Sequence, residues 1–260
     1  EAKMKILVTN DDSIYAPGIK VLTQILQKMG EVVVFAPATQ QTAKGHSMTF
    51  SGEIKVEKKD FLEGVEAYAV YGTPRDCVNV ATDAFVKDVG LVVSGINEGS
   101  NISNCCVASG TIGAATAAFN LGIPAVAVSL DFGRKMDYEA GAPYISEIIS
   151  WFVQQPFNRD FILSINIPNR EDGVIKGVTV GDYGGKQLFD SNYEIVRHEN
   201  DTFYVALNPG GIFYEMDEEQ RNKDHDIYAL SDGYVVLTPL DDDVVKKDSL
   251  SELRKYSFQE

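Results

Sequence analysis

The chain has few of the residues that build disulfide frameworks, zinc sites or nucleic-acid surfaces. Its 260 residues include three cysteines and three histidines, and 23 basic residues against 38 acidic ones give a formal net charge of −15. The low, odd cysteine count argues against a disulfide scaffold and suggests a reducing, cytoplasmic location. The negative charge argues against binding to a nucleic-acid polymer or an anionic membrane, but it is compatible with a small anionic substrate. No apolar run is long enough to span a membrane.

Short apolar runs alternate with helical patterns over the first two thirds of the chain. Residues 5–9 and 32–36 are typical of buried strands, and Pro17 begins a helix between them that ends at Gly30. The alternation continues with strands at 91–95, 124–128 and 161–167 and with helices at 112–121 and about 138–152. We therefore predict an α/β fold, in which a mostly parallel sheet is covered by helices on both faces.

The pattern changes near residue 180. Residues 181–232 are rich in Gly, Tyr, Asn and acidic residues without a helical period, which favours an extended arm or hairpin used in self-association. Residues 233–238 are typical of one more strand, and an acidic tail with a short helix is expected at 241–243 and 250–256. We therefore divide the chain into an α/β core at 4–180, the arm at 181–232, and a C-terminal strand and tail at 233–260.

Two adjacent carboxylates, Asp11 and Asp12, end the first apolar run. Like charges this close raise each other's pKa and destabilise the fold unless a positive group lies between them. Divalent cations such as Mg²⁺ and Mn²⁺ prefer oxygen ligands, so the pair is a candidate metal site. A turn that ends in a helix cap explains the same residues equally well.

Three more polar, glycine-containing segments follow expected strands or begin a helix. They are residues 39–47, 94–101 and 109–111. Parallel strands end at one edge of the sheet, where ligands bind, so all four segments should meet there. Asn97 could cap a turn or offer its amide oxygen to a cation. Ser109-Gly110-Thr111 could be an ordinary helix cap or a helix N-terminus that binds phosphate.

Several segments resemble, in the same order, the family of the stationary-phase survival protein SurE, which comprises metal-dependent nucleoside monophosphate phosphatases. The matching segments are residues 6–12, 36–37, 45–49, 72–78, 94–101, 109–111 and 234–240. The resemblance implies a Rossmann-like core and hydrolysis of nucleoside monophosphates by a 5′-nucleotidase or acid-phosphatase type of reaction. It also implies one divalent cation per subunit, Mg²⁺ or Mn²⁺, and dimers or tetramers with exchanged C-terminal elements.

The same resemblance implies a set of site residues. The cation ligands would be Asp11, Asp12, Thr42 and Asn97, with Thr42 at a position where the family typically has serine. The phosphate pocket would comprise Asn101, Ser109, Gly110 and Thr111. Asp11 and Asp12 would be the catalytic pair, and Asp11 either orients or deprotonates the attacking water or forms an aspartyl-phosphate. The sugar and base would bind beside the phosphate, with residues 42–47 along one wall.

The chain departs from the family pattern at four positions. Ser13 replaces a glycine, Arg75 a small residue, Cys105 an acid and Ala108 an aromatic residue. The metal ligands survive these changes, whereas substrate preference and turnover depend on the altered stretch beside the phosphate-binding turn. The sequence also leaves open the preferred nucleotide, the cleavage of polyphosphate, the physiological metal and the choice between dimer and tetramer. Two other functions stay open: a non-catalytic relative that binds a nucleotide or another anion, and a transferase that uses nucleotide sugars. Against the second, no Gly-x-Gly-x-x-Gly motif follows the first strand.

Overall fold

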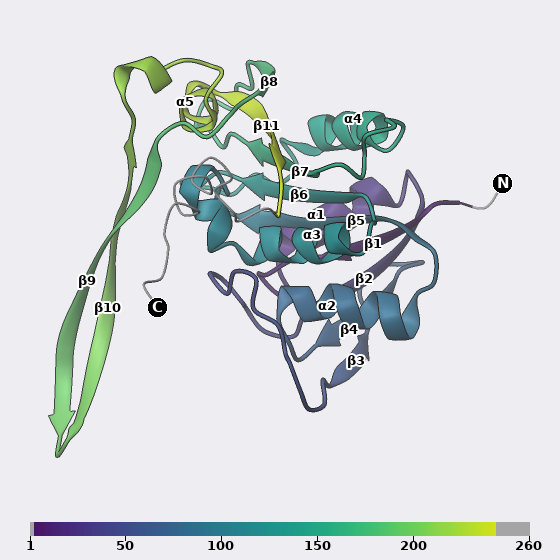
Figure 1. Ribbon diagram of the computed structural model, residues 1–260, viewed down its shortest axis with the longest axis horizontal. Helices are drawn as coiled ribbons and strands as arrows, with labels where there is room; N and C mark the ends of the chain where they lie inside the picture. The colour runs from purple at the N-terminus through teal and green to yellow at the C-terminus, as the bar shows by residue number, and fades with distance from the viewer. Residues whose placement is uncertain (1–2, 243–260) are drawn as a thin grey trace, which may run out of the picture.

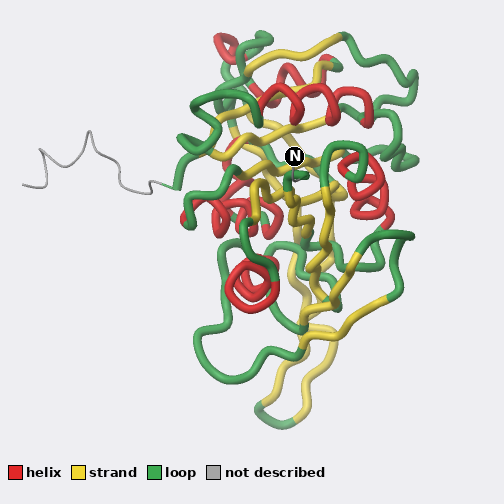
Figure 2. The backbone as a smooth tube through the Cα atoms, turned by 90° about the vertical axis from the view of Figure 1, so that its right-hand side faces the viewer, coloured by secondary structure: helices red, strands yellow, loops and turns green. Residues whose placement is uncertain are grey.

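A nine-stranded, mostly parallel sheet forms the centre of the computed structural model, with helices on both sides of the strands (Figures 1 and 2). The structure describes residues 3–242, apart from the side chains of residues 187–191 and 208–213, so the predicted tail helix lies outside the described residues. The strand order is β3-β4-β2-β1-β5-β6-β7-β11-β8. These strands are β1 (Lys5–Thr9), β2 (Glu31–Pro37), β3 (Val56–Lys59), β4 (Glu66–Val70), β5 (Val89–Glu98), β6 (Ala125–Leu130), β7 (Ile162–Ile167), β8 (Gly177–Val180) and β11 (Tyr234–Leu240).

The strand pairing confirms the predicted α/β class. All of the pairs from β4 through β2, β1, β5 and β6 to β7 are parallel, whereas β3 pairs antiparallel with β4 and β11 pairs antiparallel with β7. Every residue of β6 and β7 is buried, as expected for strands that helices cover on both faces. The strands β3, β4 and β8 were not predicted, because they are short and carry exposed or half-buried residues that make no apolar run.

Two helix pairs cover the two faces of the sheet. The helices are α1 (Pro17–Leu26), α2 (Pro74–Val80), α3 (Gly110–Asn120), α4 (Ala142–Phe152) and α5 (Asp226–Asp232), with shorter turns at Ala81–Phe85, Ser103–Val107 and Glu218–Gln220. Leu22 of α1 and Ile149 of α4 share one buried core with Ile6, whereas Cys77 of α2 and Ala114 of α3 share another core with Leu7. Successive residues of β1 thus point to opposite faces.

The predicted start of α1 is correct, whereas that of α4 is not. Pro17 begins α1 as expected, because its missing N–H costs nothing in the first turn. The predicted helix start near residue 138 is wrong, since α4 begins at Ala142 with Pro143 in its first turn. None of the helices within residues 3–242 is long and apolar enough to cross a lipid bilayer.

The arm is an antiparallel hairpin of β9 (Lys186–Glu199) and β10 (Thr202–Glu215) that projects away from the core (Figures 1 and 2). Large apolar side chains are exposed along it, among them Ile195, Phe203 and Val205. An isolated two-stranded ribbon is at best marginally stable in water, so these side chains have little packing of their own. The role of the arm in self-association and the three-part division of the chain stay predictions.

A buried carboxylate joins the base of the arm to the loop after β5. Asp226 is fully buried at the start of α5 and accepts hydrogen bonds from the backbone N–H groups of Ser103 (2.6 Å), Gly184 (2.9 Å) and Ile227 (2.7 Å). Burial raises the pKa of the Asp226 carboxyl, and the three N–H donors oppose that rise. The chain entering the arm and the loop that precedes α3 therefore share one anchor.

The turn after β1 contains a strained residue. Ser13 has a φ of +94°, a value that favours glycine because a Cβ atom crowds the backbone there. Its carbonyl oxygen accepts hydrogen bonds from the Asn10 side chain (2.8 Å) and from the Ala16 N–H (3.1 Å). These contacts hold the turn in this conformation in spite of the side chain.

We expect Ser13→Gly to stabilise the protein by about 1 kcal/mol, because it removes the left-handed strain. The loss of the long 3.3 Å bond from the Tyr15 N–H to the Ser13 hydroxyl offsets part of the gain. The urea midpoint of unfolding should rise, whereas Ser51→Gly, in an exposed loop, should leave it unchanged or lower it. A lower midpoint for Ser13→Gly would contradict the strain argument.

A second anchor lies at the start of α2. Thr73 caps the helix by accepting from the Asp76 N–H (3.2 Å), and the Asp76 carboxylate accepts from the Thr73 N–H (2.9 Å). The same buried carboxylate also accepts from the N–H and the hydroxyl of Thr49, both at 2.8 Å. Asp76 thus fixes both the helix start and the loop that follows Gly45.

Asp76→Ala should lower the free energy of unfolding by about 3 kcal/mol, because it strands three donors and removes half of a capping box. Chemical denaturation measures the loss. Asp83→Ala, which removes an exposed carboxylate from the next helical segment, is the matched control and should change stability little. Equal effects of the two substitutions would refute the role given to Asp76.

Candidate active site

The carboxyl ends of β1 and β5 bring the two candidate carboxylates to one edge of the sheet. Asp11 and Asp12 follow β1 after one intervening residue, Asn10, and Asn97 lies near the end of the neighbouring β5. The Glu98 N–H donates to Asp12 Oδ2 at 3.1 Å, which ties the two strand ends together. The rim predicted from parallel topology is therefore present for these two segments.

The first turn of α3 faces Asp11. The Thr111 hydroxyl donates to Asp11 Oδ1 at 2.5 Å, and the backbone N–H groups of Gly110 and Thr111 also hydrogen-bond to this carboxylate. Ser109 caps the helix by accepting from the Ile112 N–H at 3.1 Å. A Cβ atom at Gly110 would lie 2.8 Å from Asp11 Cβ and 2.9 Å from Asp11 Oδ2, so only glycine allows this approach.

The two carboxylates lack a positive partner in the described part of the chain. Burial raises the pKa of Asp11, whose side chain is almost inaccessible, despite its hydrogen bonds. Burial, and then the charge of Asp11, raise the pKa of Asp12 to about 6. The ion pairs found within residues 3–242 all join other side chains. A cation bound here would compensate this negative charge and stabilise the ionised carboxylates.

The atoms near Asp11 and Asp12 that could bind a cation are hard oxygen ligands. The buried Asn10 Oδ1, directly before the carboxylates, has no hydrogen-bond partner among the described residues. Asn97 donates its side-chain N–H to the Gly99 carbonyl at 2.6 Å, which leaves its amide oxygen as an acceptor. Across residues 3–242, no group of three or more His, Cys, Asp or Glu side chains is arranged to hold a metal. The residues therefore fit a divalent cation that uses amide and hydroxyl oxygens besides the two carboxylates.

Thr42, the fourth predicted ligand, lies in an exposed loop. Its neighbour Gln41 donates its backbone N–H to the Asp11 carbonyl at 2.7 Å, and the Gln40 side chain hydrogen-bonds to Asp12. The loop thus reaches the carboxylates, although Thr42 itself has no described contact with them. Gln40 and Glu98 were not singled out from the sequence, because nothing in their spacing pointed to Asp12.

Asn101, predicted to hold phosphate, is part of a buried polar network. Its side-chain amide donates to Ser129 Oγ at 2.9 Å, and its backbone N–H donates to Asn166 Oδ1 at 2.8 Å. Asn166 in turn donates to the Asn101 carbonyl at 3.1 Å and to Ser164 Oγ at 3.2 Å. The sequence carried one signal of this network, namely polar residues inside the apolar strands β6 and β7.

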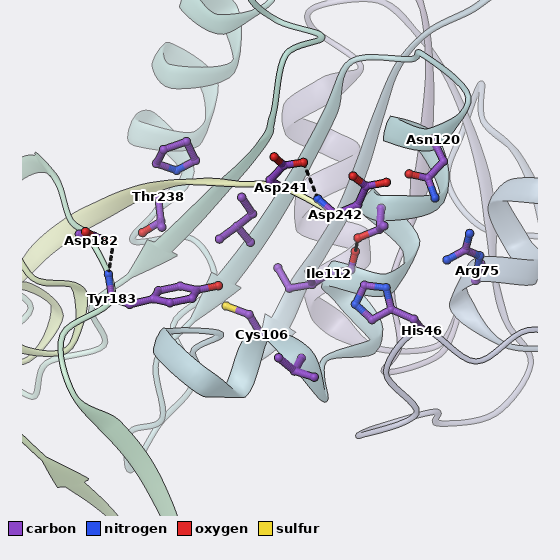
Figure 3. Close-up of a pocket in the computed structure, with 14 residues that line it drawn as sticks. His46, Arg75, Cys106, Ile112, Asn120, Asp182, Tyr183, Thr238, Asp241 and Asp242 are labelled. Carbon is purple, nitrogen blue, oxygen red and sulfur yellow. Dashed lines mark hydrogen bonds between the residues drawn. The ribbon is translucent and has the colours of Figure 1, made fainter. Parts of the chain in front are cut away.

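A separate cavity of about 690 Å³ lies beside α3, and neither Asp11 nor Asp12 lines it (Figure 3). Arg75 and His46 lie at one end of it and Tyr183 at the other. Burial, and then the charge of Arg75, lower the pKa of His46. The lining residues are His46, Arg75, Cys106, Val107, Ile112, Thr116, Asn120, Asp182, Tyr183, Thr238, Pro239, Leu240, Asp241 and Asp242. Arg75, which departs from the family pattern, therefore lies outside the carboxylate site.

The chain matches known proteins along nearly its whole length. A family model described as survival protein SurE matches residues 6–189. A protein named 5′-nucleotidase SurE from Clostridium botulinum (strain Alaska E43 / Type E3) is 34% identical over 97% of this chain and 99% of its own length. Another of that name from Alkaliphilus metalliredigens is 34% identical over 98% of this chain and 100% of its own length.

A solved structure agrees with the observed fold. The crystal structure of the SurE protein from Aquifex aeolicus has a TM-score of 0.79 to this chain at 29% sequence identity. The match covers 96% of this chain and 98% of that one. The chain belongs to the SurE family of survival proteins.

Proposed function

We propose that the protein is a phosphomonoesterase that hydrolyses nucleoside monophosphates to a nucleoside and phosphate, as a 5′-nucleotidase does. The observation that carries this function is the Asp11–Asp12 pair set against the N-terminus of α3, where Thr111 and backbone N–H groups converge. Family membership supports it, since similar relatives carry the name 5′-nucleotidase SurE. A helix N-terminus attracts phosphate, and two carboxylates can hold the cation that such chemistry uses.

The cation ligands in this proposal are Asp11, Asp12, Thr42 and Asn97, which would bind one Mg²⁺ or Mn²⁺ ion per subunit. When bound, such an ion neutralises charge on the phosphoryl group and lowers the pKa of a coordinated water. The uncompensated carboxylates and the amide oxygen of Asn97, which takes no part in the bond to Gly99, support this assignment.

The phosphate would bind at the first turn of α3, in a pocket formed by Asn101, Ser109, Gly110 and Thr111. The Thr111 hydroxyl and the N–H groups of Gly110 and Thr111, which bond to Asp11 here, would then turn from that carboxylate to phosphate oxygens, where negative charge spreads during transfer. Asn101 holds the preceding loop in place through Ser129 and Asn166. Asp11 lies against the same turn, where it either orients and deprotonates the attacking water or attacks phosphorus itself as a nucleophile.

Asp12→Asn should reduce phosphate release from AMP by at least about 100-fold and weaken Mn²⁺ binding, because the isosteric amide removes one of the two charges that hold the ion. Isothermal titration with Mn²⁺ and a phosphate-release assay measure the two effects. The matched control is Asp160→Asn, which neutralises an exposed carboxylate. Asp160 precedes β7 and so lies at the edge of the sheet opposite the site. Full activity of Asp12→Asn in EDTA would overturn the metal-dependent scheme.

In this proposal the protein also forms a dimer or tetramer in which subunits exchange C-terminal elements, and the arm is the interface. Ile195 and Val205 are directly paired across the hairpin, and both are more than half exposed. Apolar side chains clustered on a projecting element are typical of protein interfaces.

A chain with Ile195→Asp and Val205→Asp should form a smaller assembly than the wild type, because two buried charges are costly at an apolar contact. Light scattering coupled to gel filtration measures the mass. Leu121→Asp, at an exposed apolar position outside the arm, should leave the mass unchanged. A monomeric wild-type protein would refute the proposed interface.

A further inference from the structure

Two residues with no role in the scheme above follow β6 at the same edge of the sheet. β6 pairs in parallel with β5, with Asn97 opposite Ser129, and the Gly99 N–H donates to the Leu130 carbonyl at 2.8 Å. Asp131 and Phe132 come directly after that contact. They therefore lie beside the loop that connects the candidate metal ligand Asn97 to the start of α3.

The Asp131 carboxylate has unused hydrogen-bonding capacity. It accepts from the Ser100 hydroxyl at 2.8 Å and from the Phe132 N–H. It forms no ion pair with a Lys or Arg of the described residues. A carboxylate offers about four acceptor positions, so Asp131 can accept further hydroxyl donors. Burial raises its pKa, which is consistent with incomplete pairing.

The base of the arm adds a hydroxyl to the same cluster. Tyr214 of β10 hydrogen-bonds to Ser100, and burial together with the charge of Asp131 raises the pKa of Tyr214 to about 12. The phenol is therefore neutral near pH 7 and can donate or accept a hydrogen bond. Asp131 thus contacts one hydroxyl directly, and a second, neutral hydroxyl lies beyond it on Ser100.

Phe132 presents an apolar ring next to this cluster. Its side chain is 48% exposed, and the ring lies across Gly99, where a Cβ atom would meet it at 2.4 Å. Gly99 has a φ of +112°, so glycine suits this position for its backbone as well as for the space. A flat, exposed ring close to hydroxyl-binding groups is suited to stacking against a nucleobase.

We propose that Asp131 and Phe132 bind the nucleoside part of the substrate: Asp131 accepts hydrogen bonds from the ribose hydroxyls, and Phe132 stacks on the base. The proposal rests on the proposed function and adds residues after β6 to the nucleoside-binding part of the site. An acidic residue beyond the end of a strand binds ribose hydroxyls in other α/β proteins by the same chemistry.

Substrates that lack one part of the nucleotide test each residue separately. Asp131→Asn should lower kcat/KM for AMP by about 10- to 100-fold and leave kcat/KM for 2′,3′-dideoxy-AMP unchanged, because that substrate has no hydroxyl for Asp131 to bind. Phe132→Ala should lower kcat/KM for AMP by about 10-fold but not that for ribose 5-phosphate, which has no base. Phe132→Tyr should keep the wild-type values, and Asp160→Asn is the control for loss of charge.

Inhibition by adenosine and by inorganic phosphate separates nucleoside binding from effects on folding and on catalysis. Adenosine should inhibit the Asp131→Asn and Phe132→Ala variants less strongly than the wild type, whereas inhibition by inorganic phosphate should not change. Equal losses for the complete and truncated substrates, or no loss for AMP, would overturn the proposal. If the wild type hydrolyses none of the three esters, the proposed function is wrong. In that case the thermal shift produced by adenosine tests nucleoside binding on its own. The proposed role of Asp131 is wrong unless Asp131→Asn reduces that shift.

Discussion

The site depends on the close approach of a helix N-terminus to a buried carboxylate. Asp11 is nearly inaccessible to solvent, and the carboxylate of its neighbour Asp12 lies beside it. Backbone N–H groups of Gly110 and Thr111 and the Thr111 hydroxyl reduce the cost of that burial, and the missing side chain at Gly110 gives them room. These donors lie on a helix that buries its small residues against the sheet, so the fold holds them in position before any ligand arrives.

Loops from distant parts of the chain are held at this edge by a few buried polar side chains. Asn166 of β7 holds the backbone of Asn101, Asp226 of α5 holds that of Ser103, and Asp76 of α2 holds the loop around Thr49. Each accepts hydrogen bonds from backbone N–H groups that would otherwise be unsatisfied. Because Asp226 also binds the chain that enters the arm, the hairpin and the loop before α3 are mechanically connected.

The fold was largely predictable where burial dictates composition. The strands β1, β2, β6 and β7 lie under helices on both faces, so they consist of apolar runs that identify them. A cap at Ser109 was one of the two alternatives for residues 109–111, because a hydroxyl residue before a run of small residues is a local signal, and Ser109 does cap α3. The edge strands β3 and β8 were missed, since partly exposed strands need no apolar pattern and depend on their neighbours for pairing.

By itself, the sequence determined the alternation of strands and helices, the class of the fold and the positions of Asp11, Asp12 and Ser109-Gly110-Thr111 at element boundaries. These features follow from local propensity and from the periodicity of burial. Only the tertiary structure decided that Asn101 binds Ser129 and Asn166, that Thr42 lies in an exposed loop, and that Asp131, Phe132 and Tyr214 gather beside Ser100 and Gly99. Contacts between residues far apart in the chain depend on strand register and loop conformation, which the pattern of residue types does not encode.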